Sequence, residues 1–141
     1  ANATGSSGGP FGAVVVKDGK VIGEGANSVT TTNDPTAHAE IVAIRAACRA
    51  LGTFDLKGAT IYTSCEPCPM CLTAVLWARL DRMVYACDRD DAAAAGFDDS
   101  WFYEQVALPV HGRALPTTRL LAKEGNAAFK AWIANPGKIP Y

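Results

Sequence analysis

The sequence of 141 residues has little net charge, no long apolar run and no internal repeat. Its 13 basic and 14 acidic side chains give a net charge of −1, so there is no strong basic field to attract phosphate backbones. This balance counts against a protein whose main partner is nucleic acid. The apolar runs are shorter than the roughly 20 residues that a membrane-spanning helix needs, so no membrane partner is expected.

A disulfide framework is not indicated either. The five cysteines are an odd number, and three of them lie within the run TSCEPCPMC at residues 63–71. Thiols clustered at such short spacing are typical of metal or thiol chemistry in a reducing compartment, so we expect a cytoplasmic protein. The sequence does not begin with methionine, and we expect the natural chain to start before residue 1.

The apolar patterns predict one α/β domain over residues 1–141. β-rich runs at 11–16 and 21–26 flank Asp18-Gly19, a dipeptide typical of hairpin turns. The order of the elements predicts a mixed sheet, antiparallel in this first hairpin and parallel in the later strands, which right-handed crossovers would join. The other expected elements are strands at 59–64 and 82–87 and helices at 35–51, 67–80, 90–96 and 117–135.

Two cysteines are the first candidates for metal ligands. Cys68 and Cys71 lie three residues apart at the predicted start of a helix, so their sulfurs share one face. A helix N-terminus favours thiolates, and two thiolates neutralise Zn²⁺ and leave a site that accepts an imidazole. Alone, this spacing also fits a redox pair, as in a thioredoxin-like site, or two packed thiols.

The segment TAHAE at the start of the other strong helix favours the metal hypothesis. Two neighbouring parallel strands would feed both helices from the same sheet edge, so the helix N-termini can meet beyond the carboxyl ends of the strands. His38, Cys68 and Cys71 would then bind one Zn²⁺ per subunit and leave its fourth position to a water, as in catalytic sites. Glu40 could carry a proton from that water to a leaving nitrogen. Cys65 could close the site as a fourth ligand, but its place at a strand end favours a buried thiol beside it.

The combination His38-x-Glu40 and Pro67-Cys68-x-x-Cys71 resembles the zinc-dependent base deaminases of the cytidine-deaminase-like superfamily. Within it, the runs GGPFGAVVVKDGKVI, NDPTAHAEIVAIR, YTSCEPCPMCLTAVLWAR and AGFDDS and the terminal Tyr141 are similar to bacterial guanine deaminases. The resemblance implies a three-layer α/β/α domain that hydrolyses guanine to xanthine and ammonia. It also implies a homodimer that exchanges a carboxy-terminal segment of about 117–141. Such proteins usually carry a helix before GGPFG, so without it we expect one sheet face to be partly bare.

The same resemblance assigns roles around the metal. It implies Asp99 as a second catalytic carboxylate, and as substrate-binding residues Asn27, Phe11, Trp77, Ala39 and Tyr141, the last closing the partner's site. From the residues alone, Phe11 and Trp77 could instead belong to the core. Asn27 could be a turn residue, Asp99 a loop cap and Tyr141 a disordered end.

Other functions remain open from the sequence. A nucleoside deaminase acting on guanosine or cytidine would share the zinc motif. A tRNA adenosine deaminase would share DPTAHAE and EPCPMC, but it would need basic residues around the pocket. A thiol redox protein and a structural zinc module are the non-hydrolytic alternatives, and neither gives Glu40 a role.

Overall fold

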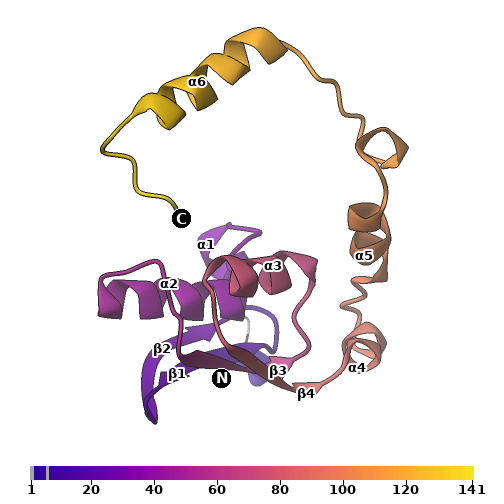
Figure 1. The fold of residues 1–141 in the computed structure, drawn as a ribbon. Helices are drawn as coiled ribbons and strands as arrows, with labels where there is room; N and C mark the ends of the chain where they lie inside the picture. The colour runs from indigo at the N-terminus through magenta and orange to yellow at the C-terminus, as the bar shows by residue number, and fades with distance from the viewer. Residues whose placement is uncertain (1, 6) are drawn as a thin grey trace. The chain divides into compact units, whose positions relative to one another are not determined.

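The computed structural model describes residues 2–5 and 7–141 and contains two compact units (Figure 1). The first extends to Glu104, and the second runs from Gln105 to Tyr141. The first unit holds the sheet and the candidate site. Among the described helices, none combines the length and apolar character needed to cross a membrane.

A four-stranded mixed sheet forms the centre of the first unit, in the order β2-β1-β3-β4. Its strands are β1 (Gly12–Lys17), β2 (Lys20–Ala26), β3 (Ala59–Cys65) and β4 (Arg82–Cys87). β1 pairs antiparallel with β2 and β3, whereas β3 and β4 are parallel, so the predicted α/β class and mixed sheet are confirmed. Asp18 and Gly19 both have positive φ, 49° and 72°, as the tight hairpin turn requires.

The helices of the first unit follow the strands. They are the 3₁₀ turn η1 (Asn2–Thr4), α1 (Val29–Thr32), α2 (Ala39–Leu51), α3 (Pro69–Trp77), α4 (Arg89–Ala94) and α5 (Ser100–Ala107), which continues into the second unit. The sequence did not predict α1 or α5. The predicted start of α2 at Pro35 was wrong by four residues, because His38 is extended, with ψ 155°, and forms the N-cap. Gly52 ends α2 in the left-handed conformation, as expected.

Helices α2 and α3 cover one face of the sheet (Figure 1). Val15 and Ile61, which are register partners, contribute to this core together with Val75 of α3. From α2 the core takes the small side chains Ala39, Ala43 and Ala47. β2 and β3 run in the same direction, so α2 and α3 begin at the same edge of the sheet. The expectation that these two strands are neighbours was wrong, because β1 pairs with both and lies between them.

The opposite face of the sheet is less covered. Val14, Tyr62 and Val84 are aligned across β1, β3 and β4, and they point away from the Val15–Ile61 side. Val14 and Val84 are half-buried and Tyr62 is 42% exposed. The side chains of this face are therefore less buried than Val15 and Ile61 on the other face.

Two glycines of β2 allow α2 to lie very close to the sheet. A Cβ atom on Gly25 would lie 2.1 Å from the Ala39 oxygen, and one on Gly23 would lie 2.4 Å from the Ala43 oxygen. Both contacts are with helix backbone, which cannot rotate away. The first turn of α2, which carries His38 and Glu40, is therefore set by backbone-to-backbone packing.

Gly25→Ala is expected to destabilise the protein by about 1–3 kcal/mol, because the added methyl must push α2 away from β2. The melting temperature and the zinc content would measure the effect, and both values should be lower than in the wild type. Gly12→Ala on β1 is the matched control, since a Cβ there would meet only the Gly25 oxygen at 3.9 Å. An unchanged melting temperature of Gly25→Ala would contradict this account of the packing.

The second unit contains the 3₁₀ turn η2 (Val110–Gly112) and α6 (Ala122–Ala134). The predicted start of α6 at residue 117 was wrong by five residues, because Leu121 has φ 52°, outside the helical region. Phe129, Trp132 and Ile133 share one side of α6 by spacing and are 68%, 44% and 69% exposed. The unit's own residues therefore do not bury the apolar side of this helix.

Candidate metal centre and active site

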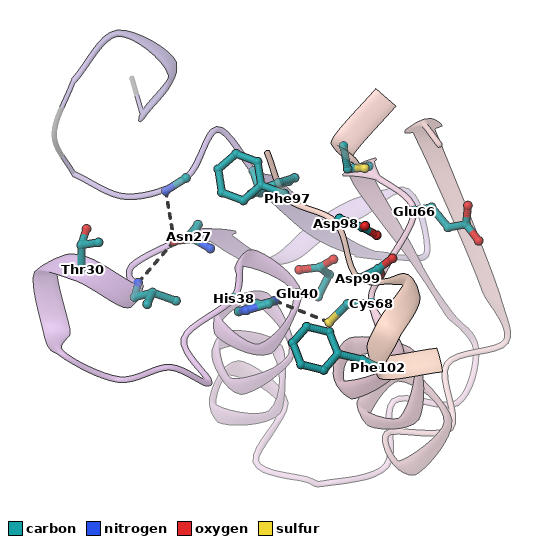
Figure 2. Close-up of a pocket in the computed structure, with 15 residues that line it drawn as sticks. Asn27, Thr30, His38, Glu40, Glu66, Cys68, Phe97, Asp98, Asp99 and Phe102 are labelled. Carbon is teal, nitrogen blue, oxygen red and sulfur yellow. Dashed lines mark hydrogen bonds between the residues drawn. The ribbon is translucent and has the colours of Figure 1, made fainter. Parts of the chain in front are cut away.

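Three side chains from the starts of α2 and α3 converge at one point. His38 is the N-cap of α2, Cys68 is the N-cap of α3, and Cys71 lies in the first turn of α3. The Nδ1 atom of His38 lies 3.6 Å from the Sγ atom of Cys68 (Figure 2) and 3.6 Å from that of Cys71. The three ligand atoms lie within 4.8 Å of one another.

This donor set fits zinc. With zinc–nitrogen distances of about 2.0 Å and zinc–sulfur distances of about 2.3 Å, tetrahedral ligands are about 3.6 Å apart. The spacing between the imidazole and each sulfur matches that edge. One imidazole and two thiolates would satisfy three positions of a tetrahedral ion, which is the arrangement of a catalytic and not a structural site.

The two sulfurs are electronically unlike in the absence of a cation. A hydrogen bond from Cys71, with help from His38, lowers the pKa of Cys68 to about 4. The same hydrogen bond, burial and the nearby Glu40 raise the pKa of Cys71. The hydrogen bond with Cys68 also raises the pKa of His38. The cluster thus carries a thiolate, which favours a bound cation.

Glu40 lies beside the three ligands as the second residue of α2. Its side chain is directed toward the cavity (Figure 2), and the residue is only 8% exposed. Burial raises the pKa of Glu40, against the hydrogen bonds from its own backbone N–H and from Cys71. A buried carboxyl group with a raised pKa can both accept and return a proton, as a general acid–base requires.

Cys65 is buried and directed elsewhere. Its Sγ atom donates to the backbone oxygen of Asp88 at 3.4 Å, the residue that caps α4. This contact agrees with a buried thiol beside the site and leaves the metal cluster with His38, Cys68 and Cys71.

A cavity of about 350 Å³ opens over the cluster, within the range of small-ligand pockets. It brings together six of the predicted site residues, Phe11, Asn27, His38, Glu40, Cys68 and Asp99. The remaining lining residues are Gly9, Val29, Thr30, Cys65, Glu66, Ala92, Phe97, Asp98 and Phe102.

Asn27 is held rigidly at the cavity wall. Its Oδ1 atom accepts hydrogen bonds from the backbone N–H groups of Gly9 at 3.2 Å and Val29 at 3.3 Å (Figure 2). Asn2 adds to this wall by donating to the backbone oxygens of Gly9 at 3.2 Å and Asn27 at 2.8 Å. Because both acceptor positions of Oδ1 are occupied, the amide NH₂ is the group that Asn27 can offer to a ligand. The residue is therefore at once a turn residue and a hydrogen-bond donor.

Asp98 and Asp99 have different tasks. Oδ1 of Asp98 accepts from the backbone N–H and the hydroxyl of Ser100 at the start of α5, and the hydroxyl contact lowers the pKa of Asp98. Asp98 therefore plays the capping role. Burial raises the pKa of Asp99, whose side chain is 16% exposed in the cavity. Asp99 is thus the carboxylate available for chemistry.

The aromatic side of the cavity was largely missed by sequence reasoning. Phe97 packs edge-to-face against Phe11, with ring centroids 4.9 Å apart and planes at 83°. Phe102 lies near Cys68 (Figure 2). The available signal was their position on either side of Asp99, within or next to AGFDDS.

Four predicted site residues do not line this cavity, the buried ligand Cys71 and three predicted substrate-binding residues. Ala39 lies between His38 and Glu40 with its side chain fully buried. Trp77 is the last residue of α3, at the opposite end of that helix from Cys68, and is 64% exposed. Tyr141 belongs to the second unit. Their roles in binding substrate stay predictions.

Comparison with known proteins places the site in a family. Residues 1–87 match the cytidine and deoxycytidylate deaminase zinc-binding region. Guanine deaminase of Bacillus subtilis is 54% identical over 134 residues, which cover 95% of this chain and 86% of that protein. Its X-ray structure superimposes with a TM-score of 0.94, covering 99% of this chain and 88% of that one.

Two further relatives match over shorter stretches. The structure of NE0047 in complex with 2,6-diaminopurine is 40% identical, with a TM-score of 0.63, and covers 65% of this chain and 52% of that one. The tRNA-specific adenosine deaminase of Agrobacterium fabrum is 51% identical over 76 residues, 54% of this chain and 50% of that protein.

Proposed function

The chain belongs to the family of cytidine and deoxycytidylate deaminases that share this zinc-binding region, and from this premise we propose that it hydrolyses guanine to xanthine and ammonia in the cytoplasm. The observation that carries the proposal is the His38, Cys68 and Cys71 cluster with Glu40 beside it, under a cavity that Asn27 bounds. Similarity to the Bacillus guanine deaminase over 95% of the chain, well beyond the zinc motif, supports the choice of substrate.

The chemistry divides between the metal and two carboxylates. Zinc, when bound, supplies a Lewis acid that makes water a nucleophile at neutral pH. Glu40 accepts a proton from water as the water oxygen bonds to C2 of guanine, and this proton passes to N3 as the C2=N3 double bond opens. The proton left on the new hydroxyl then passes through Glu40 to the 2-amino nitrogen, so that C2=O forms, the exocyclic C2–N bond breaks and ammonia leaves. Asp99 transfers protons at the ring nitrogens that Glu40, on the other side of C2, cannot easily reach.

Two groups would orient the base. The Asn27 amide donates to an acceptor atom on the purine, because its oxygen is already used by backbone N–H groups. Ala39 would bind through its backbone N–H, since its methyl is buried and first-turn N–H groups have no partner within a helix. Phe11 and Phe97 supply the apolar wall.

The proposed assembly is a homodimer that exchanges the segment of about 117–141. The apolar side of α6 supports it, because Phe129 and Ile133 stay exposed in their own unit. In this arrangement Tyr141 closes the cavity of the partner subunit. Trp77 is an aromatic contact of the substrate, so Trp77→Ala should raise KM for guanine. Sedimentation equilibrium tests the assembly, and a monomer at micromolar concentration would contradict it.

Ammonia release from a panel of guanine, guanosine, adenine, cytosine, cytidine and a tRNA anticodon stem-loop tests the substrate. Guanine is expected to give the highest kcat/KM, with xanthine as the product. Faster turnover of a nucleoside or of the stem-loop would overturn the proposal in favour of the corresponding deaminase. The tRNA-specific adenosine deaminase of Agrobacterium fabrum matches 54% of this chain, against 95% for the Bacillus guanine deaminase. This difference and the net charge of −1 speak against the last outcome.

Asn27→Asp is expected to lower kcat/KM for guanine by about 10- to 100-fold. The substitution keeps the oxygen bound by Gly9 and Val29 but replaces the donor with a second acceptor, at a loss of about 1–3 kcal/mol. Steady-state kinetics at constant zinc content would measure it. Asn33→Asp, the same change at an exposed residue after α1, is the control and should leave the kinetics unchanged. Equal kinetics of the two variants would remove Asn27 from substrate binding.

A further inference from the structure

A cation stands at an unfavourable place next to the cavity. Arg89 is the first residue of α4, where the helix dipole favours anions and disfavours a guanidinium. Asp88 and Asp91 already satisfy this helix start with a reciprocal capping box. The helix start therefore does not account for an arginine at position 89. The contacts of its side chain do.

Arg89 meets two residues of the α5 start. Its Nε atom lies 4.0 Å from Oδ1 of Asp99, and its guanidinium carbon lies 4.4 Å from the centroid of the Tyr103 ring. Asp99 and Tyr103 are four residues apart, so they share one side of the first turn. The guanidinium is thus bracketed by a carboxylate and an aromatic face, the two partners that suit its planar charge.

Tyr103 in turn contacts the metal-ligand loop. Its hydroxyl donates to the backbone oxygen of Pro67 at 2.9 Å. Pro67 is fully buried and directly precedes the ligand Cys68. The first turn of α5 is therefore tied to the segment that carries a zinc ligand, and Arg89 links the same turn to α4.

We propose that Arg89 and Tyr103 are positioning residues for deamination: Tyr103 holds the start of α5 against the metal-ligand loop, and Arg89 aims the Asp99 carboxylate into the cavity. This inference rests on the proposed function, because Asp99 is the group through which both residues act. Neither residue touches the substrate. Their contribution is the fixed relation between Asp99 and the metal cluster.

Electrostatics around Asp99 gives Arg89 a second effect. Burial and the negative charges of Cys68 on α3 and Glu66 in the loop before it raise the pKa of Asp99. Arg89 from α4 is the cation that lowers it, while Tyr103 on α5 is neutral near pH 7. Removing the guanidinium would leave Asp99 less ionised and less well oriented at the same time.

A purely structural ion pair would behave differently. The side chain of Arg89 is 39% exposed, and ion pairs of that exposure contribute little to stability. Loss of Arg89 should therefore leave the melting temperature nearly unchanged while kcat falls. This separation of kcat from stability distinguishes positioning from support of the fold.

A double-mutant cycle tests the proposal. Arg89→Met is expected to lower kcat for guanine about 10-fold and Asp99→Asn about 100-fold or more, both with normal zinc content. The double variant should be no slower than Asp99→Asn, because Arg89 has no effect once its target is neutral. Arg89→Lys should recover part of the lost kcat. Tyr103→Phe, which keeps the ring but removes the hydroxyl, should lower kcat less than Arg89→Met, and it should add no further loss when combined with Asp99→Asn. Losses that multiply in the double variant would overturn the proposal.

A control and a second readout complete the design. Arg79→Met removes another guanidinium from an aromatic ring, that of Phe54 at 5.7 Å, outside the cavity lining, and should leave kcat unchanged. A ¹³C NMR titration of the Asp99 carboxylate in the zinc-loaded protein should show a higher pKa in Arg89→Met than in the wild type. That titration decides the positioning role even if the wild type does not deaminate guanine. An unchanged pKa would overturn the role of Arg89, whereas an inactive wild type with a shifted pKa would overturn only the proposed function.

Discussion

Glu40→Gln is expected to retain zinc and to lose guanine turnover by about 10³- to 10⁴-fold, the range attributed to general acid–base catalysis. Glutamine has nearly the same shape as glutamate, so the packing of this buried side chain at the start of α2 is kept. It cannot accept the proton from water or return one to the departing amine. Binding of guanine should change little, and the loss should appear in kcat.

Metal analysis and steady-state kinetics on the same preparation would measure this result. Glu24→Gln is the matched control, because Glu24 is an exposed residue of β2 outside the cavity lining. It removes one negative charge, as Glu40→Gln does, and should leave both zinc and kcat unchanged. A Glu40→Gln enzyme within tenfold of wild-type activity would remove Glu40 from the mechanism.

Cys68→Ser is expected to abolish stoichiometric zinc binding and, with it, all measurable deamination. The substitution replaces a thiolate by a hydroxyl that stays protonated and binds zinc poorly, and two remaining protein ligands do not hold the ion in competition with a chelator. Zinc content should fall from about one ion per subunit to a small fraction of that value. Added zinc should restore little activity.

Cys65→Ser provides the comparison, because it makes the same change three residues before Cys68, at the end of β3. Its thiol is directed to the backbone oxygen of Asp88, so the variant should retain the metal. Zinc loss from Cys65→Ser, or full retention by Cys68→Ser, would show that the ligands were misassigned.

The metal cluster could be predicted from the sequence because its spacing is local. The separation of Cys68 from Cys71 follows from helix geometry, and the approach of His38 follows from strands that deliver two helices to one sheet edge. The fold class could be predicted as well, because the order of strands and helices follows from local apolar patterns. The predicted start of α2 was too early, because the spacing of apolar residues cannot show that His38 is an extended N-cap.

The wall formed by α4 and α5 could not be predicted from local patterns. α5 has no strong periodic signal in SWFYEQVA, and its place is set by tertiary contacts such as the hydrogen bond from Tyr103 to the Pro67 oxygen. The partnership of Arg89 with Asp99 spans ten positions and two helices. Asn27 was predicted from resemblance, whereas the orientation of its amide required the backbone N–H groups of Gly9 and Val29.

The close packing of β2 against α2 has a consequence for metal exchange. Gly23 and Gly25 leave no side chain between strand and helix, so moving α2 away from β2 would break close backbone packing, and this packing holds the helix start at His38 against the sheet. A wider ion such as cadmium would lengthen every bond to its ligands. The extra room would then have to come from α3, by a shift of its two sulfurs, and the imidazole would keep its place.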